Sequence, residues 1–161
     1  MTTMLRTLLA LCFGVALGFG AAPAFAVGGD STPTAAPKPP ADPNVTAAKQ
    51  AIDAKDWGKA LELLKKADAK DADVQNWLGY TYRNMGNFDL AFKHYEEAIR
   101  INPKHRGAHE YIGEAYLLTN NLKKAEEHLA ALDKLCFFPC EEYNELKEKV
   151  TAYKKKTASG G

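Results

Sequence analysis

Serine is almost absent from this sequence, and its scarcity excludes a large class of enzymes. The 161 residues contain serine only at Ser31 and Ser159, both in segments that we expect to lie outside the folded domain. A serine nucleophile must be held rigidly beside a general base, so neither position suits a serine hydrolase. A glycine-rich phosphate loop is also missing, and His109-Glu110 begins no zinc-protease motif because Gly113 stands where the second histidine is required. We therefore expect a protein that is not an enzyme.

An excess of either charge is missing as well. The chain has 21 basic and 20 acidic residues, and the N-terminal segment described next carries Arg6 and no acid, so the remainder should be neutral overall. Nucleic-acid-binding proteins normally concentrate a basic excess on one face, so the composition argues against a nucleic-acid partner. The acidic residues alternate with lysines at helical spacing, which is typical of a solvated helix face and not of paired catalytic carboxylates.

Long apolar runs are confined to the N-terminus. Arg6 supplies a positive charge, residues 8–19 form an apolar stretch, and Ala24-Phe25-Ala26 places small residues where a signal peptidase reads them. This order predicts a signal peptide at residues 1–26 with cleavage after Ala26, and hence a periplasmic or secreted bacterial protein. No later apolar stretch reaches the length of a bilayer-spanning helix, so we expect no membrane span after cleavage.

Two polar segments flank the expected domain. Residues 27–43 contain five prolines and almost no apolar side chains, a composition that cannot bury enough surface to fold. We interpret them as a disordered Pro/Ala-rich linker. Residues 154–161 are polar and end in two glycines, so we expect a flexible tail.

The sequence between these segments is helical and repetitive. Apolar residues recur every three or four positions, as at Leu78, Tyr82 and Met85. Short turn signals separate pairs of such runs, and they are Lys55-Asp56, Gly86-Asn87 and Asn120-Asn121. Helix, tight turn and helix therefore occur three times, which predicts an all-α stack.

The register of the middle unit, residues 72–105, is the most informative. Its marked positions are Leu78-Gly79, Tyr82, Ala91, Tyr95, Ala98 and Pro103. The next unit, 106–139, has Ile112-Gly113, Tyr116, Ala125 and Leu129 at the same offsets, and the first, about 41–71, aligns more weakly through Trp57, Ala60, Leu64 and Ala67. In each unit a small residue (Ala48, Gly79, Gly113) should let the first helix approach the second closely.

In this pattern the chain resembles the tetratricopeptide repeat (TPR) family. The resemblance implies a TPR α-solenoid at residues 44–153, with three repeats and a C-terminal capping helix at 139–153. The segment LDKLCFFPCEEYNEL also resembles the end of small periplasmic TPR proteins of proteobacteria.

Two cysteines, Cys136 and Cys140, remain after the N-terminal segment, and an even number in an exported chain is consistent with a disulfide. Pro139 should break the helix and let the chain bend there. Our main interpretation is a structural disulfide that locks the corner before the capping helix, with no cofactor. Redox-active thiols are one alternative. A copper or zinc site in which His105 and His109 join the two cysteines is another.

The TPR resemblance also implies a concave groove lined by the first helix of each repeat. Carried over to this chain, the exposed groove positions include Lys49, Asn76, Tyr80, Arg83, Asn84, Glu110 and Glu114. An ordinary polar surface would have a similar composition. The resemblance implies a scaffold or adaptor that binds a protein or peptide in this groove, with Arg83 able to hold a carboxylate through two hydrogen bonds. A thiol-redox or metal-handling protein is the alternative function, and association of two copies through an uncapped end is a further possibility.

Overall fold

The computed structural model describes residues 42–138 and 140–159, all within one unit of the chain, Pro39–Gly161. The described residues form seven helices, α1 (Pro43–Asp53), α2 (Trp57–Leu64), α3 (Ala72–Asn84), α4 (Phe88–Ile101), α5 (Arg106–Leu118), α6 (Leu122–Leu135) and α7 (Glu141–Ser159). No strand occurs in this part of the chain, so the all-α expectation is confirmed. The expected signal peptide and residues 27–41 of the expected linker lie outside the described residues. None of the described helices is long and apolar enough to cross a membrane.

Short polar side chains begin most of these helices. Asp56, Asn87 and Asn121 each accept a hydrogen bond from a backbone N–H of the first turn of α2, α4 and α6. The residue before each of them has a positive φ, at Lys55, Gly86 and Asn120, and reverses the chain at the end of the preceding helix. The three turn signals read from the sequence are thus the three tight turns inside the repeats.

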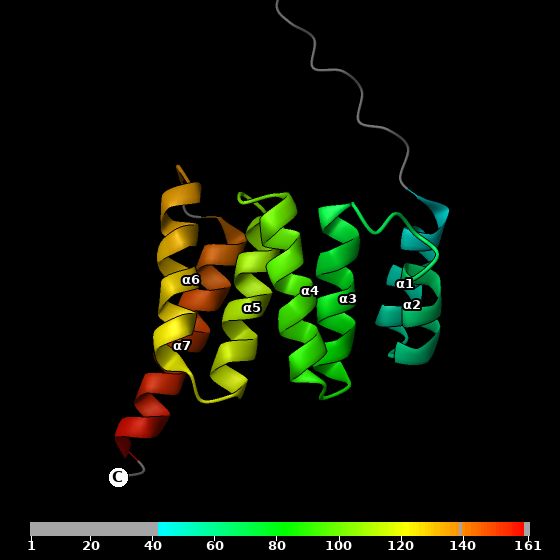
Figure 1. The fold of residues 1–161 in the computed structure, drawn as a ribbon. Coiled ribbons are helices and arrows are strands. Elements are labelled where there is room, and N and C mark those ends of the chain that lie inside the picture. Colours follow the sequence, from blue (N-terminus) through cyan, green and yellow to red (C-terminus); the bar gives the residue numbers. More distant parts are fainter. Residues whose placement is uncertain (1–41, 139, 160–161) are drawn as a thin grey trace, which may run out of the picture. The chain divides into compact units, whose positions relative to one another are not determined.

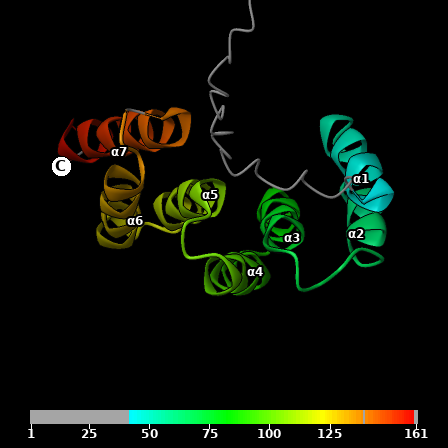
Figure 2. The ribbon, with the colours of Figure 1, turned by 90° about the horizontal axis from the view of Figure 1, so that it is seen from above.

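The helices form two curved layers. Successive helices pack in pairs along the chain, and α5 also contacts α3 and α7. Figure 2 shows α1, α3, α5 and α7 along the inner side of the curve and α2, α4 and α6 along the outer side, while Figure 1 shows α3, α4, α5 and α6 following one another along the stack. We call the inner side the concave face. The expected TPR α-solenoid with a capping helix is confirmed.

Two glycines allow close helix contacts, but against different kinds of neighbour. A Cβ atom added at Gly79 of α3 would lie 2.6 Å from the ring of Tyr95 in α4, as expected for the two helices of one repeat. A Cβ atom added at Gly113 of α5 would instead lie 2.6 Å from Leu146 in α7. The three atoms nearest to a Cβ at Gly113 therefore belong to the capping helix and not to the repeat partner α6. The capping helix takes that place because α7 packs against both α5 and α6.

The capping helix is longer than the sequence suggested. It starts at Glu141 and continues to Ser159, so residues 154–159 are helical where a flexible tail was expected. Lys154 reaches back to Glu126 of α6 in an ion pair of 2.5 Å. The hydroxyl of Thr157 donates to the carbonyl of Tyr153. Leu146 and Val150 are buried where this helix packs against α5 and α6, and they complete the last hydrophobic cluster.

Candidate binding face

Three aromatic rings lie together on the concave face. Trp77 and Tyr80 are three residues apart on α3 and therefore share one side of that helix, while Tyr111 comes from α5. The ring centroids are 5.1 Å apart for Tyr80 and Tyr111, 5.7 Å for Trp77 and Tyr80, and 6.4 Å for Trp77 and Tyr111. All three side chains are only half-buried. We call them the aromatic triad; it offers a ligand a rigid apolar surface.

Arg83 lies at one edge of this triad and is already engaged. Its guanidinium lies 5.0 Å from the Tyr80 ring centroid and 5.4 Å from that of Tyr111. It also forms an ion pair with Glu114 of α5 and donates to the carbonyl of Tyr111 at 3.5 Å. The expectation that Arg83 is free to hold a ligand carboxylate is therefore not met, because Glu114 supplies that carboxylate from within the protein.

An acidic cluster surrounds Glu110 between α5 and α7. Glu114 pairs with Lys149 of α7 as well as with Arg83, and Lys149 lies 3.5 Å from Glu145. Glu110 is only 5% exposed. Burial, followed by the neighbouring carboxyls of Glu145 and Glu114, raises the pKa of Glu110 to about 8. A large part of the Glu110 population is thus protonated near neutral pH.

A cleft of about 370 Å³ opens beside Glu110. Its lining comes from α1, α3, α5, α7 and the turn before α5, and consists of Lys49, Asp73, Asn76, Trp77, His105, Gly107, Glu110, Tyr111, Glu141, Glu142 and Glu145. Five of these side chains are carboxylates and only Lys49 is a lysine or arginine. We call this the acidic cleft. It lies directly against two members of the aromatic triad, so aromatic and acidic groups meet on one surface.

The remaining groove positions vary in exposure. Lys49 is exposed and its Nζ lies 4.9 Å from the Trp77 ring centroid. Asn84 is exposed, and its side-chain amide donates to the carbonyl of Tyr80 in its own helix at 2.8 Å. Asn76 and Glu110 are only 4% and 5% exposed, contrary to the expectation of open groove positions. The reason is that α5 packs against both α3 and α7, so that α5 covers Asn76 of α3 and α7 covers Glu110 of α5.

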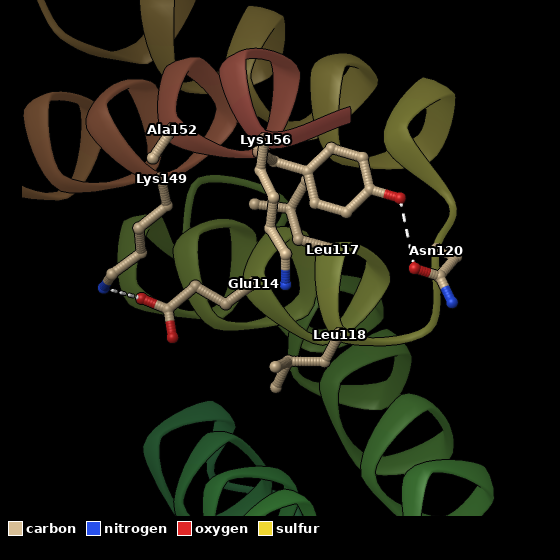
Figure 3. A pocket seen from close by; sticks show the side chains of 8 residues that line it. Glu114, Leu117, Leu118, Asn120, Lys149, Ala152 and Lys156 are labelled. Carbon is tan, nitrogen blue, oxygen red and sulfur yellow. Dashed lines mark hydrogen bonds and ion pairs between the residues drawn. The ribbon is translucent and has the colours of Figure 1, made fainter. Parts of the chain in front are cut away.

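A second, more apolar cavity lies between the C-terminal ends of α5 and α7 (Figure 3). It encloses about 520 Å³ and includes Leu117, Leu118, Ala152 and Tyr153. The Tyr153 hydroxyl donates to Oδ1 of Asn120 at 3.2 Å on one side, and the Glu114–Lys149 pair lies on the other (Figure 3). Leu118 is 62% exposed, so the cavity extends the apolar part of the concave face.

The corner between α6 and α7 contains a disulfide between Cys136 and Cys140, whose Cα atoms are 5.7 Å apart. Phe137 and Phe138 between them are exposed. The histidines of the alternative metal site are engaged elsewhere. Nε2 of His105 lies 3.0 Å from Oδ1 of Asp73, and its Nδ1 accepts from the backbone of α5.

His109 pairs with another histidine. Its Nδ1 lies 3.0 Å from Nδ1 of His128 in α6, and its Nε2 lies 3.2 Å from the carbonyl of Pro103. Burial and the neighbouring His109 lower the pKa of His128 to about 4, and burial also lowers the pKa of His109. The two rings pack between α5 and α6. Within the described residues, the one group of three or more potential ligands at metal-binding spacing is Glu110, Glu114 and Glu145. The four-residue cysteine–histidine site is therefore not assembled.

Several residues of the face were not selected from the sequence. Trp77, Tyr111, Glu145 and Lys149 were not among the groove positions chosen from the sequence. The spacing of Glu145 and Lys149, four residues apart on one helix, marks a shared helix face. What the sequence did not show is that this face of α7 turns toward Glu110 and Glu114.

Comparison with known proteins agrees with this architecture. A family model described as tetratricopeptide repeat matches residues 72–105, the unit with the clearest register. Residues 72–105 are therefore similar to one tetratricopeptide repeat. The chain is 35% identical over 74 residues to the anaphase-promoting complex subunit CDC16 of Saccharomyces cerevisiae and 32% identical over 75 residues to the human protein O-mannosyl-transferase TMTC3. These matches cover 44% and 45% of this chain but only 9% and 8% of those proteins, so the chain spans less than a tenth of the length of either relative.

Solved structures show the same fold in a protein of similar size. The type III secretion translocator chaperone SycD of Yersinia enterocolitica superposes with a TM-score of 0.63 at 21% identity, over 71% of this chain and 83% of SycD. A structure of SycD in complex with a peptide of the translocator YopD superposes with a TM-score of 0.59, over 68% and 86% of the two chains. At this identity the likeness establishes the fold.

Proposed function

We propose that this protein is an exported, non-enzymatic scaffold that binds an extended segment of another protein on its concave face. The observation that carries the proposal is the aromatic triad, since three half-buried rings packed within 6.4 Å of each other offer a rigid apolar surface beside polar groups. Such a surface suits side chains of an extended peptide, while the neighbouring hydrogen-bonding groups set its direction.

A structural neighbour supports this use of the fold. SycD, which shares the helical stack, has been solved with a peptide of its translocator YopD. That finding concerns SycD, and at 21% identity it does not transfer the partner. It supports the general expectation that a stack of this kind accommodates a peptide.

Replacing Trp77 by Ala tests the concave face. We expect the captured amount of the partner from an extract of the native cell envelope to fall about tenfold or more, because aromatic anchors dominate such interfaces. Met85→Ala is the matched control, because Met85 is 50% exposed at the turn after α3 and does not line the acidic cleft. Circular dichroism confirms that both variants fold. Equal capture by the two variants would place binding on a different surface.

Export is the second part of the proposal. It rests on the order of charge, apolar stretch and small residues in positions 1–26. Cell fractionation and intact-mass measurement test it: the protein should appear in the periplasm or medium with the mass of a chain that begins at Val27. A cytoplasmic protein with the full-length mass would contradict this expectation.

The redox or metal alternative for Cys136 and Cys140 is tested by thiol titration of the native protein. A structural disulfide leaves both sulfurs unreactive until the protein is unfolded and reduced. Two titratable thiols in the native protein would favour the alternative. Sizing chromatography with light scattering tests whether two copies associate.

A further inference from the structure

We infer that the acidic cleft selects a lysine or arginine side chain of the bound segment, with the cation held between the Glu110–Glu145 carboxyls and the rings of Trp77 and Tyr111. This inference rests on the proposed function and adds the chemistry of the partner to it. The concave face then binds an extended segment at two places: apolar groups bind at the aromatic triad, and one cation binds in the acidic cleft.

Hydrogen-bond acceptors dominate the cleft. The carboxyls of Asp73, Glu110, Glu141, Glu142 and Glu145 supply acceptor oxygens. Basic residues are fewer. Lys49 is exposed at the α1 edge and lies over Trp77, and Arg106 pairs with Glu142 at 3.4 Å. The chemistry that complements so many acceptors is a donor that carries positive charge.

The side chain of Asn76 also indicates a hydrogen-bond donor as the ligand, independently of the carboxyls. It is 4% exposed and lines the cleft, and its Oδ1 has no hydrogen-bond partner among the described residues. A buried carbonyl oxygen without a donor costs free energy in the empty protein. Because this oxygen is shielded from solvent while Nδ2 lies toward the cleft residue Gly107, a half-turn of the side-chain amide brings Oδ1 to a guanidinium or ammonium group in the cleft.

Glu110 forms no ion pair with another described residue. Lys149 is close enough to act on its charge, but it pairs directly with Glu114 and Glu145. The carboxyl of Glu110 hydrogen-bonds to that of Glu145, and this bond favours the protonated form of Glu110. A cation beside the two groups would favour the charged form of both.

The aromatic walls favour an organic cation over a metal ion. Trp77 already accepts an ammonium group, since Nζ of Lys49 lies 4.9 Å from its ring centroid. A metal ion at Glu110, Glu114 and Glu145 would have to displace Arg83 and Lys149 from Glu114. A side-chain cation needs no such displacement, because Glu110 and Glu145 face it directly.

Binding should depend on pH through Glu110. The groups that face it are Asp73 and Lys49 from α3 and α1, His105 and Glu114 from α5 and the turn before it, and Glu141, Glu142, Glu145 and Lys149 from α7. Because the pKa of Glu110 is raised to about 8 in the unliganded protein, a cation gains its full attraction only above that pH. Raising the pH from 7 to 9 should therefore tighten the binding of an arginine probe, which stays charged throughout, about five- to tenfold.

The test is an NMR titration of the full chain with N-acetyl-L-arginine methylamide and N-acetyl-L-lysine methylamide. The neutral N-acetyl-L-norleucine methylamide is the chemical control. We expect both cationic probes to shift the side-chain amide of Asn76 and the indole N–H of Trp77, and norleucine to leave them unshifted. Glu110→Gln should weaken arginine binding about tenfold at pH 9 and abolish its pH dependence, while the exposed Glu148→Gln should match the wild type.

Three outcomes would overturn the inference. Norleucine could bind as tightly as arginine, Glu110→Gln could leave the dissociation constant unchanged, or calcium chloride or magnesium chloride at micromolar concentration could shift the same signals and show a metal site. After any of these outcomes the proposed function still stands if Trp77→Ala reduces partner capture as expected. If Trp77→Ala also leaves partner capture unchanged, the concave face is rejected as a binding surface.

Discussion

Glu110 shows most clearly how a single side chain here is held in an unfavourable environment. It is 5% exposed and is surrounded by carboxyls from its own helix and from α7. The surrounding structure stabilises the neutral acid and opposes the carboxylate, which is the pattern of groups kept for binding or chemistry more often than for stability. The charged form of Glu110 therefore destabilises the free protein, and by the inference above it would stabilise a complex with a cation.

This cost predicts a pH-dependent stability change for Glu110→Gln. The unfolded chain loses its Glu110 proton near the ordinary value of 4.5, whereas the folded protein keeps it until about pH 8. The stabilising contribution of this group is present below pH 4.5 and is lost as the pH rises toward 8. Glutamine cannot lose a proton, so the variant should exceed the wild type in free energy of unfolding by about 4 kcal/mol at pH 8 and by about 1 kcal/mol at pH 5.

Urea unfolding at pH 5, 6.5 and 8 measures this difference. Glu148→Gln on the exposed side of α7 serves as the control and should show no such trend. A Glu110→Gln difference that stays constant from pH 5 to 8 would mean that Glu110 titrates normally in the folded protein.

At the scale of the element, the distance between paired helices depends on single glycines. The ring of Tyr95 in α4 lies over Gly79 of α3 and leaves no room for a methyl group. Tyr95 is fully buried, so it cannot move toward solvent to make room. Gly58 near the start of α2 differs, because a Cβ atom there would meet only Oδ1 of Asp56 at 3.8 Å.

Gly79→Ala should therefore destabilise the protein, by about 1–3 kcal/mol from overpacking. Gly58→Ala should stabilise it by a few tenths to about 1 kcal/mol, since alanine is the better helix former and finds open space. Thermal and urea unfolding of the two variants against the wild type give the comparison. Two alanine substitutions with the same sign would show that helix propensity, and not the contact with Tyr95, controls both positions.

At the scale of the whole molecule, the core is divided along the stack. Buried residues form separate clusters, one around Leu64, Val74 and Leu78 at the α1–α3 end and another around Leu132, Leu146 and Val150 at the α7 end. Each layer thus depends mainly on its neighbours, as expected for a solenoid. The capping helix supplies Glu141, Glu142 and Glu145 to the lining of the acidic cleft.

This division predicts a local response to Leu146→Ala. Leu146 is fully buried against Gly113, so its truncation should cost about 3 kcal/mol. Hydrogen exchange followed by mass spectrometry should show lost protection in α5, α6 and α7 and little change in α1 and α2. Val74→Ala is the matched substitution at the other end and should show the reverse pattern. A uniform loss of protection in either variant would indicate that the described helices unfold as a single unit.

The sequence by itself determined the repeat architecture, because the information is local. Helix starts follow from Asp56, Asn87 and Asn121, which cap the next helix in each repeat, and the tight turns follow from the residues just before them. Apolar spacing and the Gly79–Tyr95 offset then imply how the two helices of one repeat pack. Local hydrogen bonding and packing at a fixed register need no knowledge of the rest of the chain.

Only the tertiary structure decided which polar groups meet on the concave face. Nothing in the sequence indicates that Arg83 is neutralised by Glu114, 31 residues away, or that α7 extends to Ser159 and brings Glu145 against Glu110. The burial of Asn76 and Glu110 likewise depends on neighbouring layers that cover them. Charge and burial depend on long-range contacts, and these are set by the curvature of the stack and by the placement of its last helix.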